Sequence, residues 1–205
     1  MRITLVEFLR CYRLQAVVFA VVLLVSGQAL ARETYMQFSA RLVTAAEAAH
    51  LERADLALEL FNLANSYRVS KGVRALRANT LNHSAAVAHA MDMMQNNFMG
   101  HIASTGQDFE SRMRALRGGG MIALPRMAEN AARVSKSGVV DKAMAHRLFQ
   151  QWVTSAEHRH ALLSRDFVSV ATGVVSQGGV LYADQIFVGL ETKTNLGSSS
   201  EDGLY

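Results

Sequence analysis

The chain has 205 residues, a length that fits one domain with a short appendage. Half of the residues are hydrophobic and 19% are charged, so the composition excludes a wholly disordered chain and a collagen-like repeat. The net charge of +4 comes without a lysine- or arginine-rich run, which argues against a dedicated nucleic-acid binder. A single cysteine excludes a disulfide scaffold and a cysteine-rich zinc site.

Residues 1–31 have the pattern of a secretory signal peptide. Three arginines precede an apolar run over residues 16–25, and the triplet Ala29-Leu30-Ala31 follows that run. Because a membrane-spanning helix needs about 20 apolar residues, the run is too short to favour a stable transmembrane segment. We predict cleavage after Ala31, which removes Cys11, and a periplasmic or secreted location in a bacterium.

Helical periodicity dominates the first half of the remaining chain. We expect a helical lead-in over residues 32–53, with a helix from residue 41 to 51. Apolar residues at spacings of three and four predict a further helix that ends before Gly72. Asn79-Thr80 is a candidate cap for the next helix, and a short helix over residues 109–117 precedes three consecutive glycines.

The second half of the chain mixes helix and strand patterns. A short strand is expected over residues 129–134 and a helix over residues 142–153, after which Ser155 has the character of an N-cap. Two β-rich runs, residues 167–175 and 180–188, flank a Gln-Gly-Gly turn and predict a hairpin. Helices packed on a small, mostly antiparallel sheet make an α+β fold.

The last residues of the chain differ from the rest in composition. Residues 192–205 are rich in serine, glycine and acidic residues and show no periodicity, so we predict a disordered tail there. The folded domain is then expected to span residues 54–191.

Three short motifs contain the residue types that could carry chemistry: Gly100-His101 with Arg112, Glu129-Asn130, and Trp152 to Leu163 with His158. Each alone has a structural explanation, as a loop histidine, a carboxylate at a strand end and a capped helix. The chain has no H-E-x-x-H, no G-x-S-x-G and no glycine-rich phosphate loop, so three common enzyme signatures are absent. We interpret the helical histidines 83, 89 and 146 as surface or core-edge residues.

In this order the motifs resemble the bacterial branch of the CAP superfamily, also called the SCP, PR-1-like or cysteine-rich secretory protein family. The resemblance spans about residues 60–187. It rests on Asn65-x-x-Arg68-x-x-x-Gly72, Ala86-x-x-His89-Ala90-x-Asp92-Met93, His101 with Gly106 and Arg112, Glu129-Asn130, His158-Arg159 with Leu162-Leu163, Val170 to Gly173, and Gln185-x-Phe187. It implies a three-layer α-β-α sandwich with a small, mostly antiparallel sheet.

The resemblance also implies a cavity lined by His101, Glu129 and His158. Eukaryotic members carry a second cavity glutamate after the tryptophan, but Ser155 stands there in this chain, and Ala128 replaces the usual glycine before Glu129. The implied ligand-binding set is therefore a triad. Two imidazoles and one carboxylate can bind Zn²⁺ or another divalent cation, and they can equally form a plain hydrogen-bonded cluster.

These residues leave three functions open. We favour an exported, non-catalytic binding module of the envelope or extracellular space, whose partner is a small ligand, a lipid or a cell-envelope component. One alternative is a metal-assisted hydrolase of peptide or cell-wall material, with Glu129 as general base; no serine has a nucleophile-elbow context. The other is a lipid carrier, in which clustered methionines could line an apolar groove, although they also suit a helix core.

Overall fold

The fold is built around a four-stranded mixed sheet. A computed structural model describes residues 33–120, 123–136 and 138–190, so the predicted signal peptide and tail lie outside the described residues. The strands are β1 (Arg77–Ala78), β2 (Met127–Ser135), β3 (Phe167–Gln177) and β4 (Val180–Gly189), in the order β1-β3-β4-β2. β3 and β4 form the predicted hairpin, β2 is antiparallel to β4, and the short β1 is parallel to β3.

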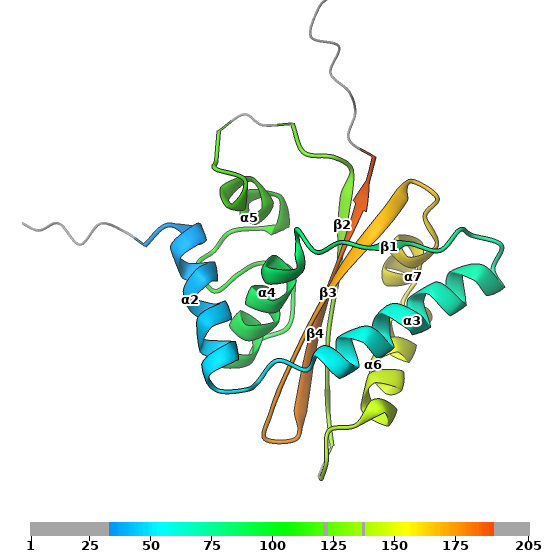
Figure 1. Cartoon of the computed structure of the whole chain (residues 1–205), viewed down its shortest axis with the longest axis horizontal. Coiled ribbons are helices and arrows are strands. Elements are labelled where there is room, and N and C mark those ends of the chain that lie inside the picture. The colour runs from blue at the N-terminus through cyan, green and yellow to red at the C-terminus, as the bar shows by residue number, and fades with distance from the viewer. Residues whose placement is uncertain (1–32, 121–122, 137, 191–205) are drawn as a thin grey trace, which may run out of the picture. The chain divides into compact units, whose positions relative to one another are not determined.

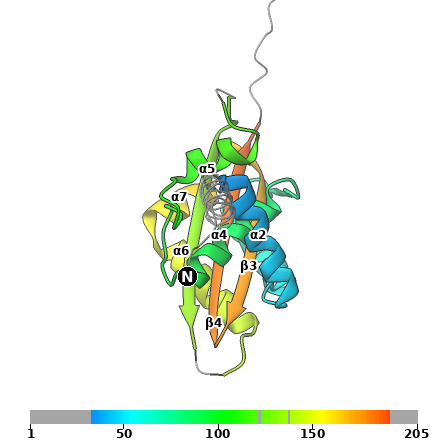
Figure 2. The same cartoon turned by 90° about the vertical axis from the view of Figure 1, so that its left-hand side faces the viewer.

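Helices cover both faces of the sheet (Figure 1). One face carries α2 (Tyr35–Ala48), α4 (His83–Gln95) and α5 (Phe109–Leu116), and the opposite face carries α3 (Ala54–Ser70), α6 (Lys142–Thr154) and α7 (Ala156–Leu163). Figure 2 views the molecule from the side of α2, α4 and α5, with the long strands running behind these helices. The expected three-layer α-β-α sandwich is therefore confirmed.

Each helical layer has its own apolar core against the sheet. Leu60, Trp152 and Phe187 are buried between the sheet and the α3, α6 and α7 layer, whereas Leu42 and Met91 are buried on the other side. Methionines 91 and 93 belong to this second core with no exposed surface, so they do not line a surface groove. α2 contributes Leu42, so part of the predicted lead-in packs into the sandwich itself.

α4 lies directly on the middle of the sheet at Gly173 in β3. A Cβ atom at Gly173 would lie 2.3 Å from the backbone carbon of Ala86 and 2.3 Å from the backbone nitrogen of Val87. The glycine is therefore required by the close approach of two backbones. This contact fixes the distance between α4 and the strands. It thereby also fixes the starting point of the loop that follows α4.

The structure moves several predicted boundaries. α2 begins at Tyr35 instead of residue 41 because Thr34 and Gln37 form a capping box. α4 has Asn82 as its N-cap residue, and Asn79 supports it by accepting a hydrogen bond from the Asn82 backbone N–H at 3.1 Å. β1 escaped prediction because two residues carry no periodic pattern. Within the described residues, no helix combines the length and the hydropathy needed to cross a membrane.

Candidate functional site

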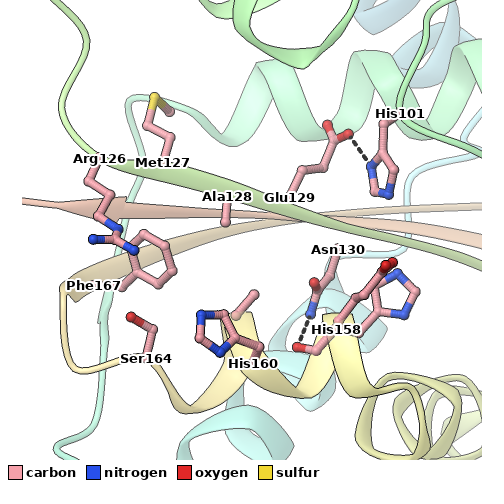
Figure 3. A pocket seen from close by; sticks show the side chains of 12 residues that line it. His101, Arg126, Met127, Ala128, Glu129, Asn130, His158, His160, Ser164 and Phe167 are labelled. Atoms are coloured by element: carbon pink, nitrogen blue, oxygen red, sulfur yellow. Dashed lines mark hydrogen bonds and ion pairs between the residues drawn. The ribbon is translucent and has the colours of Figure 1, made fainter.

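His101, Glu129 and His158 come together at one cleft, although they lie on three separate elements (Figure 3). His101 is in the loop between α4 and α5, Glu129 is on β2, and His158 is on α7. The cleft has a volume of about 300 Å³. The wall away from His101 is formed by residues in or next to β2, α7 and β3: Arg126, Met127, His160, Ser164 and Phe167.

Glu129 lies at the base of the cleft, and its side chain is only 2% exposed. Its Oε2 atom accepts a hydrogen bond from His101 Nδ1 at 2.9 Å, and its Oε1 atom accepts one from Arg112 Nη2 at 2.5 Å. Arg112 projects from α5 and is fully buried, while half of the His101 side chain is exposed. Both oxygens of the carboxylate are therefore engaged within the protein.

The loop that carries His101 is fixed by two buried residues of α4. His89 Nε2 lies 2.8 Å from the carbonyl oxygen of Gly100, the residue before His101, and so donates a hydrogen bond to it. The carboxylate of Asp92 accepts hydrogen bonds from the backbone N–H and the hydroxyl of Ser104. His89 is thus a support of the loop that is fully buried, not a surface or core-edge residue as expected, and its Nε2 atom lies 3.9 Å from Glu129 Oε2.

Helix caps position Arg112 and His158. Asp108 caps α5 by accepting a hydrogen bond from the Ser111 backbone N–H at 2.8 Å, which begins the helix one turn before Arg112. Ser155 caps α7 by accepting from the His158 backbone N–H, as predicted. The side-chain amide of Asn130, next to Glu129, donates to the carbonyl oxygen of His158 at 3.1 Å. This bond ties α7 to β2.

The charges in the cleft shift the pKa values of its groups in opposite directions. Burial raises the pKa of Glu129, but the hydrogen bond from His101 and the charge of Arg112 outweigh burial and leave that pKa below its ordinary value. The hydrogen bond to Glu129 raises the pKa of His101. Burial lowers the pKa of His158, and the nearby His101 lowers it further. The pKa of His101 is thus higher than that of His158, so His101 takes up a proton first as the pH falls.

His101 and His158 are the two residues of the predicted triad whose ring nitrogens could hold a divalent cation. In the described part of the chain, no three His, Cys, Asp or Glu side chains are grouped as metal ligands. The rings of His101 and His158 have their centroids 6.4 Å apart, and His158 Nδ1 has no hydrogen-bond partner among the described residues. The atoms left to bind a metal through a lone pair are therefore His101 Nε2 and a ring nitrogen of His158. Glu129 lies behind His101.

Sequence motifs predicted the triad but gave Arg112 no role of its own. They also missed Asp184 of β4, which is fully buried and whose carboxyl group lies against that of Glu129. The available signal was an ionisable residue in the middle of a run of apolar strand residues.

Comparison with known proteins agrees with the motifs. The family model described as "CAP: Cysteine-rich secretory protein family" matches residues 61–190, more than half of the chain. A relative from Bacillus subtilis (strain 168), named uncharacterized membrane protein YlbC, is 27% identical over 116 residues, which are 57% of this chain and 30% of YlbC. The chain thus matches less than one third of that relative's length.

Two solved structures share the fold. An extracellular protein containing an SCP domain from Bacillus anthracis str. Ames aligns with a TM-score of 0.51 and 22% identity, over 65% of this chain and 40% of that one. An outer surface protein from Borrelia burgdorferi aligns with a TM-score of 0.55 and 14% identity, over 68% of this chain and 98% of that one. At these identities the likeness concerns the fold alone.

Proposed function

The chain belongs to the cysteine-rich secretory protein (CAP) family, and on that premise we propose that it is an exported, non-catalytic binding protein whose cleft takes a divalent cation or a small polar ligand. The observation that carries this proposal is the hydrogen bond between His101 Nδ1 and the buried carboxylate of Glu129. A carboxylate behind a histidine fixes the tautomer and leaves the other ring nitrogen as a lone-pair donor, as in many metal sites. In this chain that nitrogen is Nε2 of His101.

The same geometry divides the triad into two ligands and one orienting group. His101 and His158 would hold the cation, and Glu129 would orient His101, since both of its oxygens are already engaged. A bound Zn²⁺ would supply a Lewis acid with open positions for a polar group. The roughly 300 Å³ of the cleft leaves space for such a group beside Phe167 and His160.

Calorimetric titration with Zn²⁺ tests the metal site. The wild-type protein is expected to bind one equivalent, and His101→Ala and His158→Ala are each expected to abolish that binding. His83→Ala is the matched control, because His83 is a partly exposed histidine bound to Glu52 outside the cleft. Affinity should also fall as the pH drops, and the fall should begin above the ordinary histidine pKa of 6.5, because the pKa of His101 is raised and a protonated imidazole cannot bind a metal. Zn²⁺ binding that survives in the variant with both His101→Ala and His158→Ala would contradict a metal site in this cleft.

A hydrolase with Glu129 as general base has less support. A general base needs a pKa near the working pH and an oxygen free to accept the proton. In Glu129 the pKa is lowered, and Arg112 and His101 occupy the two oxygens. We therefore expect peptide and peptidoglycan digests to remain unchanged when incubated with the protein and Zn²⁺. Cleavage that is lost in Glu129→Gln would establish the hydrolase instead.

A lipid carrier is the second candidate because the protein has a mainly apolar cavity away from His101 and His158. This cavity of about 240 Å³ is lined by Ala57, Leu58 and Phe61 of α3 and by residues 170–172 of β3. Leu58 is 60% exposed. Organic extraction of purified protein followed by mass spectrometry would detect a carried lipid. Loss of the lipid in Leu58→Glu, but not in His101→Ala, would place it in the apolar cavity.

Export is supported by the signal-peptide pattern of residues 1–31 and by the extracellular and outer-surface descriptions of the two solved relatives. N-terminal sequencing of the protein from fractionated bacteria tests it. A periplasmic or secreted protein that begins at Arg32 is expected. A chain that keeps Met1 and remains in the membrane fraction would indicate a retained anchor, an outcome that the membrane-protein description of YlbC makes worth testing.

A further inference from the structure

The helix α2 lies outside residues 61–190, the part of the chain that matches the family model. It is nevertheless built into the sandwich, because it packs along α4 and reaches α5 (Figure 1). Leu42 and Ala46 of this helix have no exposed surface. The first residue of α2, Tyr35, differs from these apolar residues because it carries a hydroxyl group into the interior.

The Tyr35 hydroxyl meets the arginine behind the cleft. Tyr35 is 4% exposed, and its hydroxyl is in hydrogen-bond contact with the guanidinium of Arg112, which is fully buried on α5. A guanidinium has only donor groups, so the tyrosine oxygen accepts this bond. Burial raises the pKa of Tyr35 to about 12, so the hydroxyl keeps its proton. Tyr35 therefore holds Arg112 without neutralising its charge.

Other groups surround the same guanidinium. Arg112 Nη2 donates to Glu129 Oε1 at 2.5 Å and to the carbonyl oxygen of His101 at 3.3 Å. The ring of Phe109 lies against the guanidinium, with 5.6 Å between Arg112 Cζ and the ring centroid. Because the guanidinium is planar and rigid, a contact at one edge constrains the direction of all its N–H groups. The contact with Tyr35 thus limits how far Nη2 can turn away from Glu129.

A second carboxyl group offers the Arg112 guanidinium an alternative partner. Asp184 of β4 is fully buried, its carboxyl group lies against that of Glu129, and it also interacts electrostatically with Arg112. The sheet register places Asp184 opposite Ala131, so Asp184 and Glu129 are diagonal neighbours on one face. A guanidinium near two carboxyl groups needs a further contact to keep Nη2 on one of them. Tyr35 supplies that contact.

We propose that Tyr35 is a positioning residue of the cleft, which fixes the Arg112 guanidinium so that Arg112 holds the Glu129 carboxylate against His101. Three consecutive contacts connect α2 with the cleft: Tyr35 with Arg112, Arg112 with Glu129, and Glu129 with His101. Tyr35 is not among the residues that line the cleft, so it acts through Arg112. The helix α2 is thereby part of the site, although the family motifs do not include it.

The beginning of α2 keeps Tyr35 in place. Thr34 and Gln37 form the capping box from which the helix begins at Tyr35. The rings of Tyr35 and the buried Phe38 pack with their centroids 5.8 Å apart. The predicted cleavage after Ala31 would leave the whole capping box in the mature chain. Removal of the signal peptide is therefore compatible with the contact between Tyr35 and Arg112.

The variant Tyr35→Phe tests the contact, because it removes the hydroxyl and keeps the ring. In metal-free protein we expect the Nδ1–H resonance of His101, which reports the bond to Glu129, to move upfield as that bond weakens. Tyr182→Phe is the matched control, since Tyr182 is also 4% exposed and belongs to the same apolar core but does not line the cleft. An unmoved His101 resonance in Tyr35→Phe, or an equal shift in both variants, would overturn the proposal.

Crystal structures provide an independent test. In the wild-type protein the Tyr35 hydroxyl is expected within hydrogen-bond distance of the Arg112 guanidinium, and in Tyr35→Phe the guanidinium is expected to turn toward Asp184. A wild-type Tyr35 hydroxyl that points away from Arg112, or a guanidinium that keeps its place in Tyr35→Phe, would contradict the positioning role. Both readouts use metal-free protein. They therefore remain valid if calorimetry finds no Zn²⁺ binding, and a failed positioning role is distinguishable from a failed metal site.

Discussion

Arg112 and Glu129 form an ion pair that is closed off from solvent on both sides, with Nη2 and Oε1 2.5 Å apart and side chains 0% and 2% exposed. Arg112→Met would leave the Glu129 carboxylate buried without its arginine, with His101 as its hydrogen-bond partner and His89 Nε2 3.9 Å away. Removing one member of a buried pair costs about 3–5 kcal/mol, so we expect the free energy of unfolding to fall by that amount. Urea denaturation at pH 7 measures it.

Arg114→Met is the control for this change. Arg114 lies on the same helix and pairs with Glu110, four residues earlier, where the side chains are 37% and 64% exposed. Exposed pairs contribute about 0–1 kcal/mol, so Arg114→Met should change the free energy of unfolding by no more than that. Equal losses in the two variants would mean that the buried ion pair has no special role.

The pKa of His101 depends on the Glu129 carboxylate. The hydrogen bond to Glu129 raises that pKa, while burial acts in the opposite direction. Replacing Glu129 with glutamine should therefore bring the pKa of His101 back to its ordinary value of 6.5 or below it. An NMR titration of the imidazole resonances in metal-free protein measures the change. If the pKa of His101 stays raised in Glu129→Gln, another group is responsible.

A raised pKa in the folded state gives this interaction a definite pH dependence. Protonated His101 stabilises the fold, and this contribution is complete below pH 6.5, the pKa of an unperturbed histidine. It is lost as the pH rises through the higher pKa of the folded protein. The difference in stability between the wild type and His101→Asn should therefore shrink over that range. A difference that grows with pH would contradict the assignment.

Asp184 should also make the free energy of unfolding depend on pH, but for a different reason: folding favours the neutral form of its carboxyl group. Burial raises its pKa in the folded protein, so its contribution to stability is complete below about pH 3.9 and is lost as the pH rises toward the folded-state pKa. Asp184→Asn removes this titration. The variant should therefore gain stability relative to the wild type as the pH increases from about 4. Urea denaturation at a series of pH values measures it, and a constant difference would mean that Asp184 is already ionised.

The sequence predicted those parts of the fold that have a strong local signal. The hairpin of β3 and β4 follows from β-rich runs around two glycines, and Ser155 was identified from its place before a helix. β1 was missed because its two residues form a strand only through pairing with Ser169 and Val170, far along the chain. Pairing of that kind leaves no local pattern.

The candidate site shows the same division. Motif order indicated His101, Glu129 and His158, and the structure brings them to one cleft. The partners of Glu129 depend on how α5 and β4 pack against β2, so neither the Arg112 ion pair nor the position of Asp184 could be read from spacing. Residue types could suggest a metal site, but only the contacts show that both oxygens of Glu129 are already in use.

Gly173 offers a test of how closely the helical layer must approach the sheet. In Gly173→Ala the new methyl group would lie 2.3 Å from backbone atoms of Ala86 and Val87, so α4 must move away. Overpacking of this kind costs about 1–3 kcal/mol, and we expect a loss of that size in urea denaturation. Because the loop after α4 carries His101, the His101 Nδ1–H resonance should shift as well. Gly100→Ala is the control, since a Cβ atom there meets nothing within 4 Å and should change stability by less than about 0.5 kcal/mol. Full stability in Gly173→Ala would show that the α4 layer can be displaced without cost, and that the cleft does not depend on its position.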